Sequence, residues 1–203
     1  MLSLRQYRLI ATGQRCSSSI YSAIFSSRKD LGAALGNDVS RLRAAIEPCK
    51  IALGAARQAG LTVIHTREGH WPDLSDAAPL KVARGDPALR IGAPGPMDRI
   101  LIRGEPGHDI IAELYPAPGE PVVDKPGKGA FYQTDLDLIL HNRCVDTLFV
   151  CGVTTEVCVN TTCARRTTVA SAASCCPTVA PPISPSFHAA GMAMIKAQVG
   201  IFA

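Results

Sequence analysis

The chain has 203 residues, 47% of them hydrophobic and 19% charged, so it can bury a core of its own and is expected to form a single domain. The formal charge of +4 is modest, aromatic residues make up only 5%, and no apolar run reaches the roughly 18 residues of a membrane span. We therefore expect a folded protein that binds neither nucleic acid nor membrane.

Acidic residues are unevenly distributed along the chain. Residues 1–29 and 163–187 contain no Asp or Glu, so all 17 acids lie in the remainder. Both stretches are rich in Ser and show no clear periodicity, and the second is also rich in Ala, Cys and Pro. A mitochondrial transit peptide is one interpretation of the first stretch, because such peptides are rich in Arg and Ser and poor in acids. That interpretation does not account for the second stretch.

The eight cysteines show no CxxC pair and no spacing typical of a zinc finger. A disulfide-stabilised secreted protein would usually be shorter and would begin with an apolar signal segment. We therefore expect reduced thiols in a cytoplasmic protein, most of them small core residues.

Between the two acid-free stretches the hydrophobic pattern alternates between helix and strand. Apolar residues recur at three- and four-residue steps over 39–59, which predicts a helix capped by Asn37-Asp38 and ended by Gly60. Residues 66–98 are rich in Gly, Pro and Asp and are predicted to form a loop. The other predicted elements are strands at 61–64, 121–124 and 147–151, and helices at 135–142 (capped by Thr134), from about 155, and at 188–198. Strands separated by helices predict an α/β fold, with a parallel sheet covered by helices on both faces.

Two segments that follow neighbouring predicted strands carry reactive residue types. Lys125 follows the strand at 121–124, and Cys158 lies in the first turn of the helix after the strand at 147–151. Functional residues gather at the carboxyl ends of parallel strands. A helix start and a nearby ammonium both favour a thiolate, and the free N–H groups of the helix start can hold an oxyanion. The two residues together therefore predict an activated nucleophile.

The segment Lys125-Pro-Gly-Lys-Gly-Ala-Phe, followed by Val150-Cys-Gly-Val-Thr-Thr-Glu-Val-Cys158, resembles the isochorismatase-like cysteine hydrolases. Within that family it is most similar to the biuret and ureidoacrylate amidohydrolases. The resemblance covers about residues 33–162 and resumes at 187–202. It implies a three-layer α/β sandwich with a parallel sheet of about six strands, as one domain over residues 1–203. It also implies a homotetramer that acts on a small amide or ureide.

The resemblance assigns roles to individual residues. Cys158 is the nucleophile that attacks the carbonyl carbon, and Lys125 is the lysine of the catalytic triad. The Val153–Thr154 peptide bond is expected to be cis, so that the N–H groups of Thr154 and Cys158 form the oxyanion hole. Lys128 and Gln198 are implied as substrate contacts.

No metal or other cofactor is expected. His65 and His70 could suggest a metal site, and the nicotinamidase branch of the family does bind zinc on an Asp-x-His motif. That motif is not present near these two histidines.

The aspartate of the family's triad is missing, since no segment of residues 1–32 matches the expected Ile-Asp-x-Gln-x-Asp-Phe pattern. The spacing back from Cys158 places that aspartate near Ser19. The strand that the family has after the Cys158 helix is also absent from the sequence pattern, so no strand is predicted there. If both stretches are read one nucleotide earlier, allowed codons give a first strand with an Asp at the codons of Ser19 and Ile20. The same shift over 163–187 gives a family-like helix and strand. We hypothesise that both stretches are frame-shifted relative to the family.

Three functions are compatible with the sequence. A cysteine amidohydrolase is favoured by Cys158 and Gln198. A hydrolase of the vinyl-ether bond of isochorismate is the second, since that chemistry does not require the cysteine. The third is a catalytically impaired member of the family, because the triad aspartate is missing.

Overall fold

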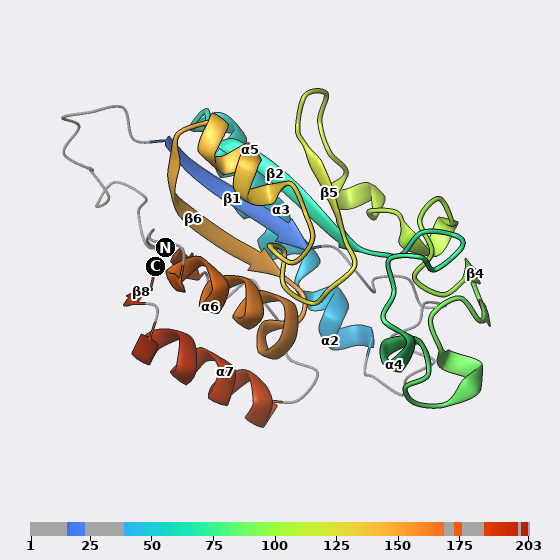
Figure 1. Ribbon diagram of the computed structural model, residues 1–203. Helices are drawn as coiled ribbons and strands as arrows, with labels where there is room; N and C mark the ends of the chain where they lie inside the picture. The colour runs from blue at the N-terminus through green and yellow to red at the C-terminus, as the bar shows by residue number, and fades with distance from the viewer. Residues whose placement is uncertain (1–15, 23–38, 169–172, 176–184, 199, 203) are drawn as a thin grey trace.

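The computed structural model describes residues 16–22, 39–168, 173–175, 185–198 and 200–202. Within these residues, six strands form one parallel sheet in the order β5-β2-β1-β6-β7-β8. The strands are β1 (Cys16–Ser22), β2 (Thr62–Glu68), β5 (Val122–Lys125), β6 (Val145–Gly152), β7 (Ala173–Cys175) and β8 (Gly200–Phe202). Helices lie on both faces of this sheet (Figure 1), so the predicted fold class is confirmed.

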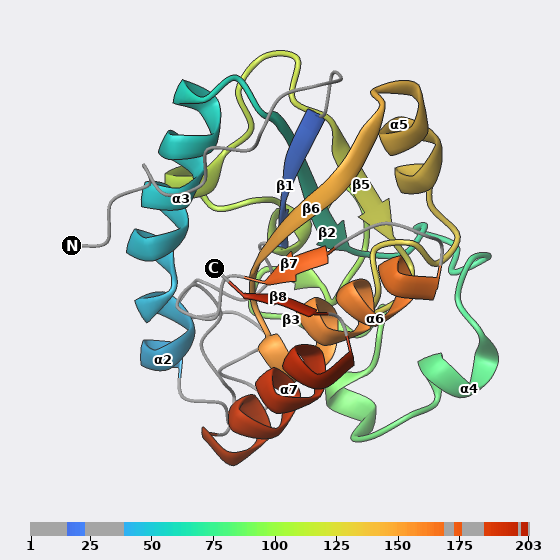
Figure 2. The ribbon, with the colours of Figure 1, turned by 90° about the vertical axis from the view of Figure 1, so that its left-hand side faces the viewer.

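Two hydrophobic clusters join the sheet to its helices. One lies under α2 (Val39–Ala44) and α3 (Ile46–Gln58), and the other under α5 (Leu136–Asn142), α6 (Asn160–Thr168) and α7 (Pro185–Gln198). Figure 2 shows the two groups of helices on opposite sides of the sheet. Successive residues of a strand point to opposite faces, so Val63 packs in the first cluster and Ile64 in the second. None of the described helices is long and apolar enough to cross a membrane.

The predicted helix over 39–59 is divided into α2 and α3 at Ala45. Pro48 accounts for the division, because it has no N–H to donate to the carbonyl of Ala44 four residues earlier. The predicted buried face survives the break, with Leu42, Cys49 and Leu53 at 3%, 1% and 2% exposure. The predicted cap, Asn37-Asp38, lies outside the described residues.

The connection from β2 to β5 is mostly loop, as its Gly and Pro content predicts. It contains α4 (Pro79–Val82) and three short 3₁₀ turns (Pro87–Leu89, Pro106–His108 and Ala112–Leu114). A two-residue antiparallel pair, β3 (Pro94–Gly95) and β4 (Asp98–Arg99), also lies within it. The predicted strand at 61–64 was too short, because β2 continues to Glu68 through His65 and Thr66, which are both buried.

Two strands form in regions where the sequence shows no clear strand pattern. β1 lies in the middle of the sheet, where Ser19 pairs with Val63 of β2 and with Phe149 of β6. The prediction that no strand follows the Cys158 helix was wrong, because β7 pairs with Leu148–Val150 of β6. Both segments form strands because their backbones pair with an adjacent strand, although their own side-chain patterns do not indicate a strand.

Candidate active site

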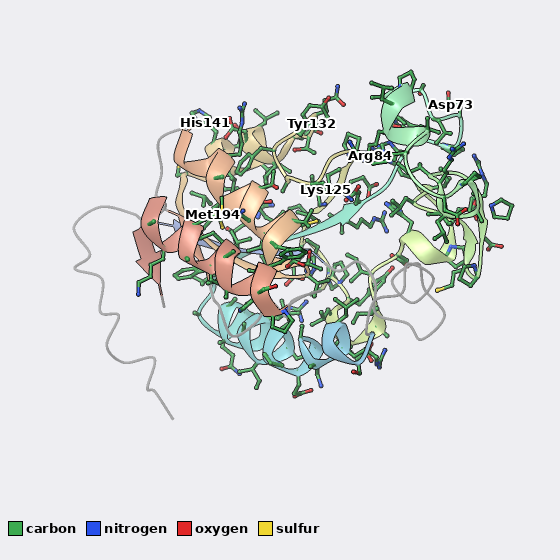
Figure 3. All side chains as sticks on the ribbon, turned by 90° about the horizontal axis from the view of Figure 1, so that it is seen from below. Asp73, Arg84, Lys125, Tyr132, His141 and Met194 are labelled. Carbon is green, nitrogen blue, oxygen red and sulfur yellow. The ribbon has the colours of Figure 1, made fainter. Side chains whose placement is uncertain are left out.

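Lys125 and Cys158, the two residues singled out at strand ends, lie in contact. Lys125 is the last residue of β5, and Cys158 lies in a π-helical turn (Thr155–Val159) between β6 and α6. The Lys125 Nζ atom is 3.7 Å from Cys158 Sγ, and the two residues are 0% and 8% exposed. Figure 3 shows Lys125 near the middle of the molecule. The sequence predicts that β5 and β6 are neighbouring strands. This prediction is wrong, because β2 and β1 lie between them in the sheet.

The loop after β5 holds the Lys125 ammonium and is itself held against α6. Lys125 Nζ donates to the carbonyls of Gly127 and Lys128 at 3.2 and 3.1 Å. The loop backbone passes so close to α6 that a Cβ atom on Gly129 would lie 2.8 Å from Thr161 Cγ2. A side chain at position 129 would therefore push the loop, and with it the lysine's acceptors, away from the helix that follows Cys158.

Helix α7 supports the turn that carries Cys158. The Nδ1 atom of His188 is 2.8 Å from Thr155 Oγ1 at the first residue of that turn. Gly191 of the same helix packs against Glu156, where an added Cβ would lie 3.3 Å from the Cα atom. Helix α7 therefore holds the first two residues of the turn in place.

Glu68 is a site residue that the sequence analysis missed. It is the last residue of β2, is 2% exposed, and has its Oε2 atom 3.6 Å from Lys125 Nζ. Its other contacts are ion pairs with Lys81 at 3.1 Å and with Lys128 at 3.2 Å. Burial alone would raise the pKa of Glu68, but the charges of Lys125, Lys128 and Lys81 outweigh it and hold that pKa below its ordinary value. Glu68 is therefore an ionised carboxylate among three ammonium groups.

Lys81, also missed, reaches into this cluster from α4. Besides Glu68, its ammonium contacts His70 Nε2 at 3.0 Å and the Pro126 carbonyl. Burial, and next the charge of Lys81, lower the pKa of His70, so the ring is neutral at pH 7. An ammonium can only donate, so Nε2 is the acceptor and Nδ1 carries the proton toward Asp76 Oδ1, 3.1 Å away.

The two histidines of the metal alternative do not share a site. His65 pairs with Glu120 at 2.8 Å, whereas His70 contacts Lys81 and Asp76. No three His, Cys, Asp or Glu side chains are grouped to hold a metal in the part of the chain that the structure describes.

The remaining predicted site residues are Thr154, Lys128 and Gln198. Thr154 precedes the turn, is 5% exposed, and follows a cis peptide bond from Val153, as the resemblance implied. Lys128 contacts Glu68, and about half of its side chain is exposed. Gln198 is the last residue of α7, and its side chain lies outside the described part of the structure.

A cavity of about 540 Å³ borders the Lys81 cluster. Asp76 and Pro126 line it, and Trp71 stands at its wall with the Arg103 guanidinium stacked 4.4 Å from the ring centroid. The loop between β2 and β5 contributes Trp71, Asp76 and Arg103 to this wall.

The central strand brings no carboxylate to the site. β1 has the sequence Cys-Ser-Ser-Ser-Ile-Tyr-Ser, and Ser19, where the triad aspartate is expected, lies within it. Within the described residues, Glu68 is the only carboxylate in contact with Lys125.

Comparison with known proteins identifies the class of protein. The sequence matches the family model described as the isochorismatase domain over residues 27–201. The chain belongs to the isochorismatase family of hydrolases.

The relatives similar in sequence include two amidohydrolases. The chain is 33% identical over 139 residues to ureidoacrylate amidohydrolase RutB of Pantoea ananatis. The aligned residues cover 63% of this chain and 52% of that protein. It is also 33% identical over 138 residues to the protein of the same name from Azorhizobium caulinodans, with coverages of 63% and 58%. The aligned region thus spans a little over half the length of these relatives.

Solved structures show the same fold. A cysteine hydrolase from Pseudomonas syringae has a TM-score of 0.77 at 24% identity, over 92% of this chain and 87% of that one. An isochorismatase family protein from Desulfovibrio vulgaris has a TM-score of 0.74 at 24% identity, over 91% of both chains. The N-carbamoylsarcosine amidase of Thermoplasma acidophilum has a TM-score of 0.67 at 18% identity, over 91% and 93% of the two chains.

Proposed function

We propose that this chain is a cysteine amidohydrolase that cleaves the C–N bond of a small amide or ureide through a covalent intermediate on Cys158. The observation that carries the proposal is the 3.7 Å contact between Lys125 Nζ and Cys158 Sγ in a buried site. The names of two sequence relatives and one structural neighbour favour an amide or ureide bond. We expect the enzyme to act as a homotetramer in the cytoplasm, where its thiols stay reduced.

The proposed reaction begins with attack of the Cys158 sulfur on the substrate carbonyl carbon. The Lys125 ammonium stabilises the thiolate, and the N–H groups of Thr154 and Cys158 hold the negative oxygen of the tetrahedral intermediate. Collapse of that intermediate breaks the C–N bond and leaves a thioester-type acyl enzyme, which water hydrolyses. Lys128 and Gln198 orient the substrate from its polar end.

The test compares two reaction products. We expect ammonia release from biuret, ureidoacrylate or a related ureide, and loss of that release by a factor of at least roughly a thousand in Cys158→Ser. Mass spectrometry of the enzyme quenched during turnover should show an acyl adduct on Cys158. Pyruvate release from isochorismate, undiminished in Cys158→Ser, would instead support vinyl-ether hydrolysis.

The absence of an acidic residue in β1 favours one alternative, a catalytically impaired member of the family. Such a protein would release neither ammonia nor pyruvate and would still assemble as an oligomer. Size-exclusion chromatography with light scattering, run beside both assays, separates this alternative from a protein that has failed to fold.

A further inference from the structure

Glu68 occupies a position from which it can act on the nucleophile through Lys125. Its carboxylate is 3.6 Å from Lys125 Nζ, which is in turn 3.7 Å from Cys158 Sγ. The strand that lies beside β2 contributes no acid. The chemistry proposed above needs a group that takes the thiol proton during attack and returns it to the departing nitrogen.

The surroundings of Lys125 allow a proton to be redirected. Four acceptors surround its ammonium, namely the carbonyls of Gly127 and Lys128, the sulfur of Cys158 and the carboxylate of Glu68. An ammonium has only three protons, so these acceptors compete for them. Contacts of this length shorten in many enzymes when the substrate binds.

We propose that Glu68 is the proton acceptor of the reaction, reached through Lys125, in the role that an acidic residue of β1 would otherwise fill. This inference rests on the proposed cysteine hydrolase function. Because Glu68 acts through Lys125 and touches no reacting atom, it is a positioning residue.

The proton steps balance as follows. During attack the S–H bond of Cys158 breaks and its proton passes to Lys125, while another proton of Lys125 passes to Glu68 and the C–S bond forms. The site then holds a neutral Glu68, a charged Lys125 and a negative substrate oxygen. When the C–N bond breaks, the nitrogen keeps the electron pair and takes a proton from Lys125, which recovers one from Glu68. During hydrolysis of the acyl enzyme, water bonds to the carbonyl carbon and loses a proton along the same route to Glu68. The C–S bond then breaks, and the sulfur keeps the electron pair and takes a proton from Lys125, which recovers one from Glu68.

The charges that face Glu68 explain why the proton is returned. Lys125 approaches from β5, Lys128 from the loop that follows, and Lys81 from α4. Three ammonium groups disfavour a protonated Glu68, so the acid formed during attack readily gives its proton back.

The experiment compares Glu68→Gln with Glu68→Asp in the full chain. Glu68→Gln keeps the side-chain shape but cannot accept the proton, so we expect kcat for ureide hydrolysis to fall about a hundredfold or more. KM should change less than about threefold. Glu68→Asp should restore part of kcat, because it restores the carboxylate.

Iodoacetamide labelling of Cys158 supplies the readout that a merely structural role would not give. Removing a negative charge while Lys125 stays in place favours the thiolate, so Glu68→Gln should be labelled at least as fast as the wild type at pH 7. The half-maximal labelling rate should also move to lower pH. Unchanged kcat in Glu68→Gln would overturn the proposal. A parallel loss of hydrolysis and labelling would overturn it too, because Glu68 would then only support the site.

Glu120→Gln is the matched control. Glu120 is a second carboxylate in a network of ion pairs, bound by Arg57 at 2.7 Å and by His65 at 2.8 Å and making no contact with Lys125. Loss of the Glu120 carboxylate should lower the free energy of unfolding. It should not lower kcat for ureide hydrolysis while leaving the labelling rate of Cys158 unchanged. If the wild type hydrolyses no ureide, the proposed function fails. The pH of half-maximal labelling of Cys158 in Glu68→Gln then decides the inference. A value equal to that of the wild type overturns the coupling of Glu68 to Cys158 through Lys125, and a lower value supports it.

Discussion

The Thr162 hydroxyl joins the carbonyl of Cys158 to the loop that follows Lys125. It donates to Cys158 O at 2.7 Å and accepts from the N–H of Ala130 at 3.1 Å, and Thr162 is only 4% exposed. Substitution Thr162→Val keeps the shape and leaves the Ala130 N–H without this acceptor. We expect a loss of about 1–3 kcal/mol in the free energy of unfolding, measured by urea denaturation.

Thr162→Ser is the control for that prediction. It keeps the hydroxyl and loses one methyl group, so it should retain most of the stability and the labelling rate of Cys158. Equal stability of the wild type and Thr162→Val would mean that the hydroxyl does not hold the loop to α6.

The thiols should differ in reactivity in an order set by their surroundings. We expect Cys158 to react fastest with iodoacetamide near neutral pH, ahead of Cys151 and Cys163, which are 3% and 0% exposed. Cys144 is exposed and serves as an ordinary accessible thiol for comparison. Peptide mapping after brief labelling gives the order. Preferential labelling of any other cysteine would contradict the assignment of the nucleophile.

Stability should fall as the solution is acidified, partly because of His108. Burial, and next the charge of Arg67, lower the pKa of His108 to about 4, and its Nε2 atom lies 3.5 Å from Asp124 Oδ1 without a hydrogen bond. In the unfolded chain the ring binds a proton near pH 6.5. Between about pH 6.5 and 4, His108 is therefore protonated in the unfolded chain and neutral in the folded one. The free energy of unfolding falls as the pH falls through that window.

Urea denaturation at several pH values checks this expectation. His108→Gln does not titrate, so its free energy of unfolding should depend less steeply on pH within the window, by up to about 1.4 kcal/mol per pH unit. Above pH 7 the slopes of the wild type and the variant should agree. Identical slopes throughout would show that His108 keeps its ordinary titration in the folded protein.

The frame-shift hypothesis predicts a gain of both stability and activity on repair. A variant carrying the re-read segments would regain large apolar side chains in β1, each worth on the order of 2–5 kcal/mol when buried, and an aspartate near Ser19. We expect it to melt higher and to hydrolyse ureides at least roughly a hundredfold faster than the chain as it stands. Equal melting and equal turnover would mean that both segments are native. Codons that do not permit the re-reading would also exclude the hypothesis.

The fold class and the Lys125–Cys158 pair could be predicted because their signals are local. Short apolar runs separated by helical periodicity define the layers, and the two residues lie within a dense family-like segment. The positions of β1 and β7 could not be predicted, since their own side chains do not alternate. Their place depends on the backbones of β2 and β6, which are far away in the sequence.

Glu68 and Lys81 were missed for a related reason. Apolar character ends at Ile64, so the sequence predicts a loop where β2 continues and does not place Glu68 at a strand end. A polar residue at the carboxyl end of a parallel strand indicates a functional site only when the position of that strand end can be predicted. Lys81 lies in a loop whose course no periodicity defines.

The contacts of Lys81 limit how the loop between β2 and β5 can change during evolution. One ammonium from α4 reaches Glu68, His70 and the Pro126 carbonyl at the same time. A replacement loop must still deliver a cation to that point, because otherwise Glu68 loses one of its three ammonium partners and both His70 Nε2 and the Pro126 carbonyl lose the donor described here. A loop taken from a relative should therefore be tolerated when it brings a lysine to this point, and should destabilise the protein when it does not.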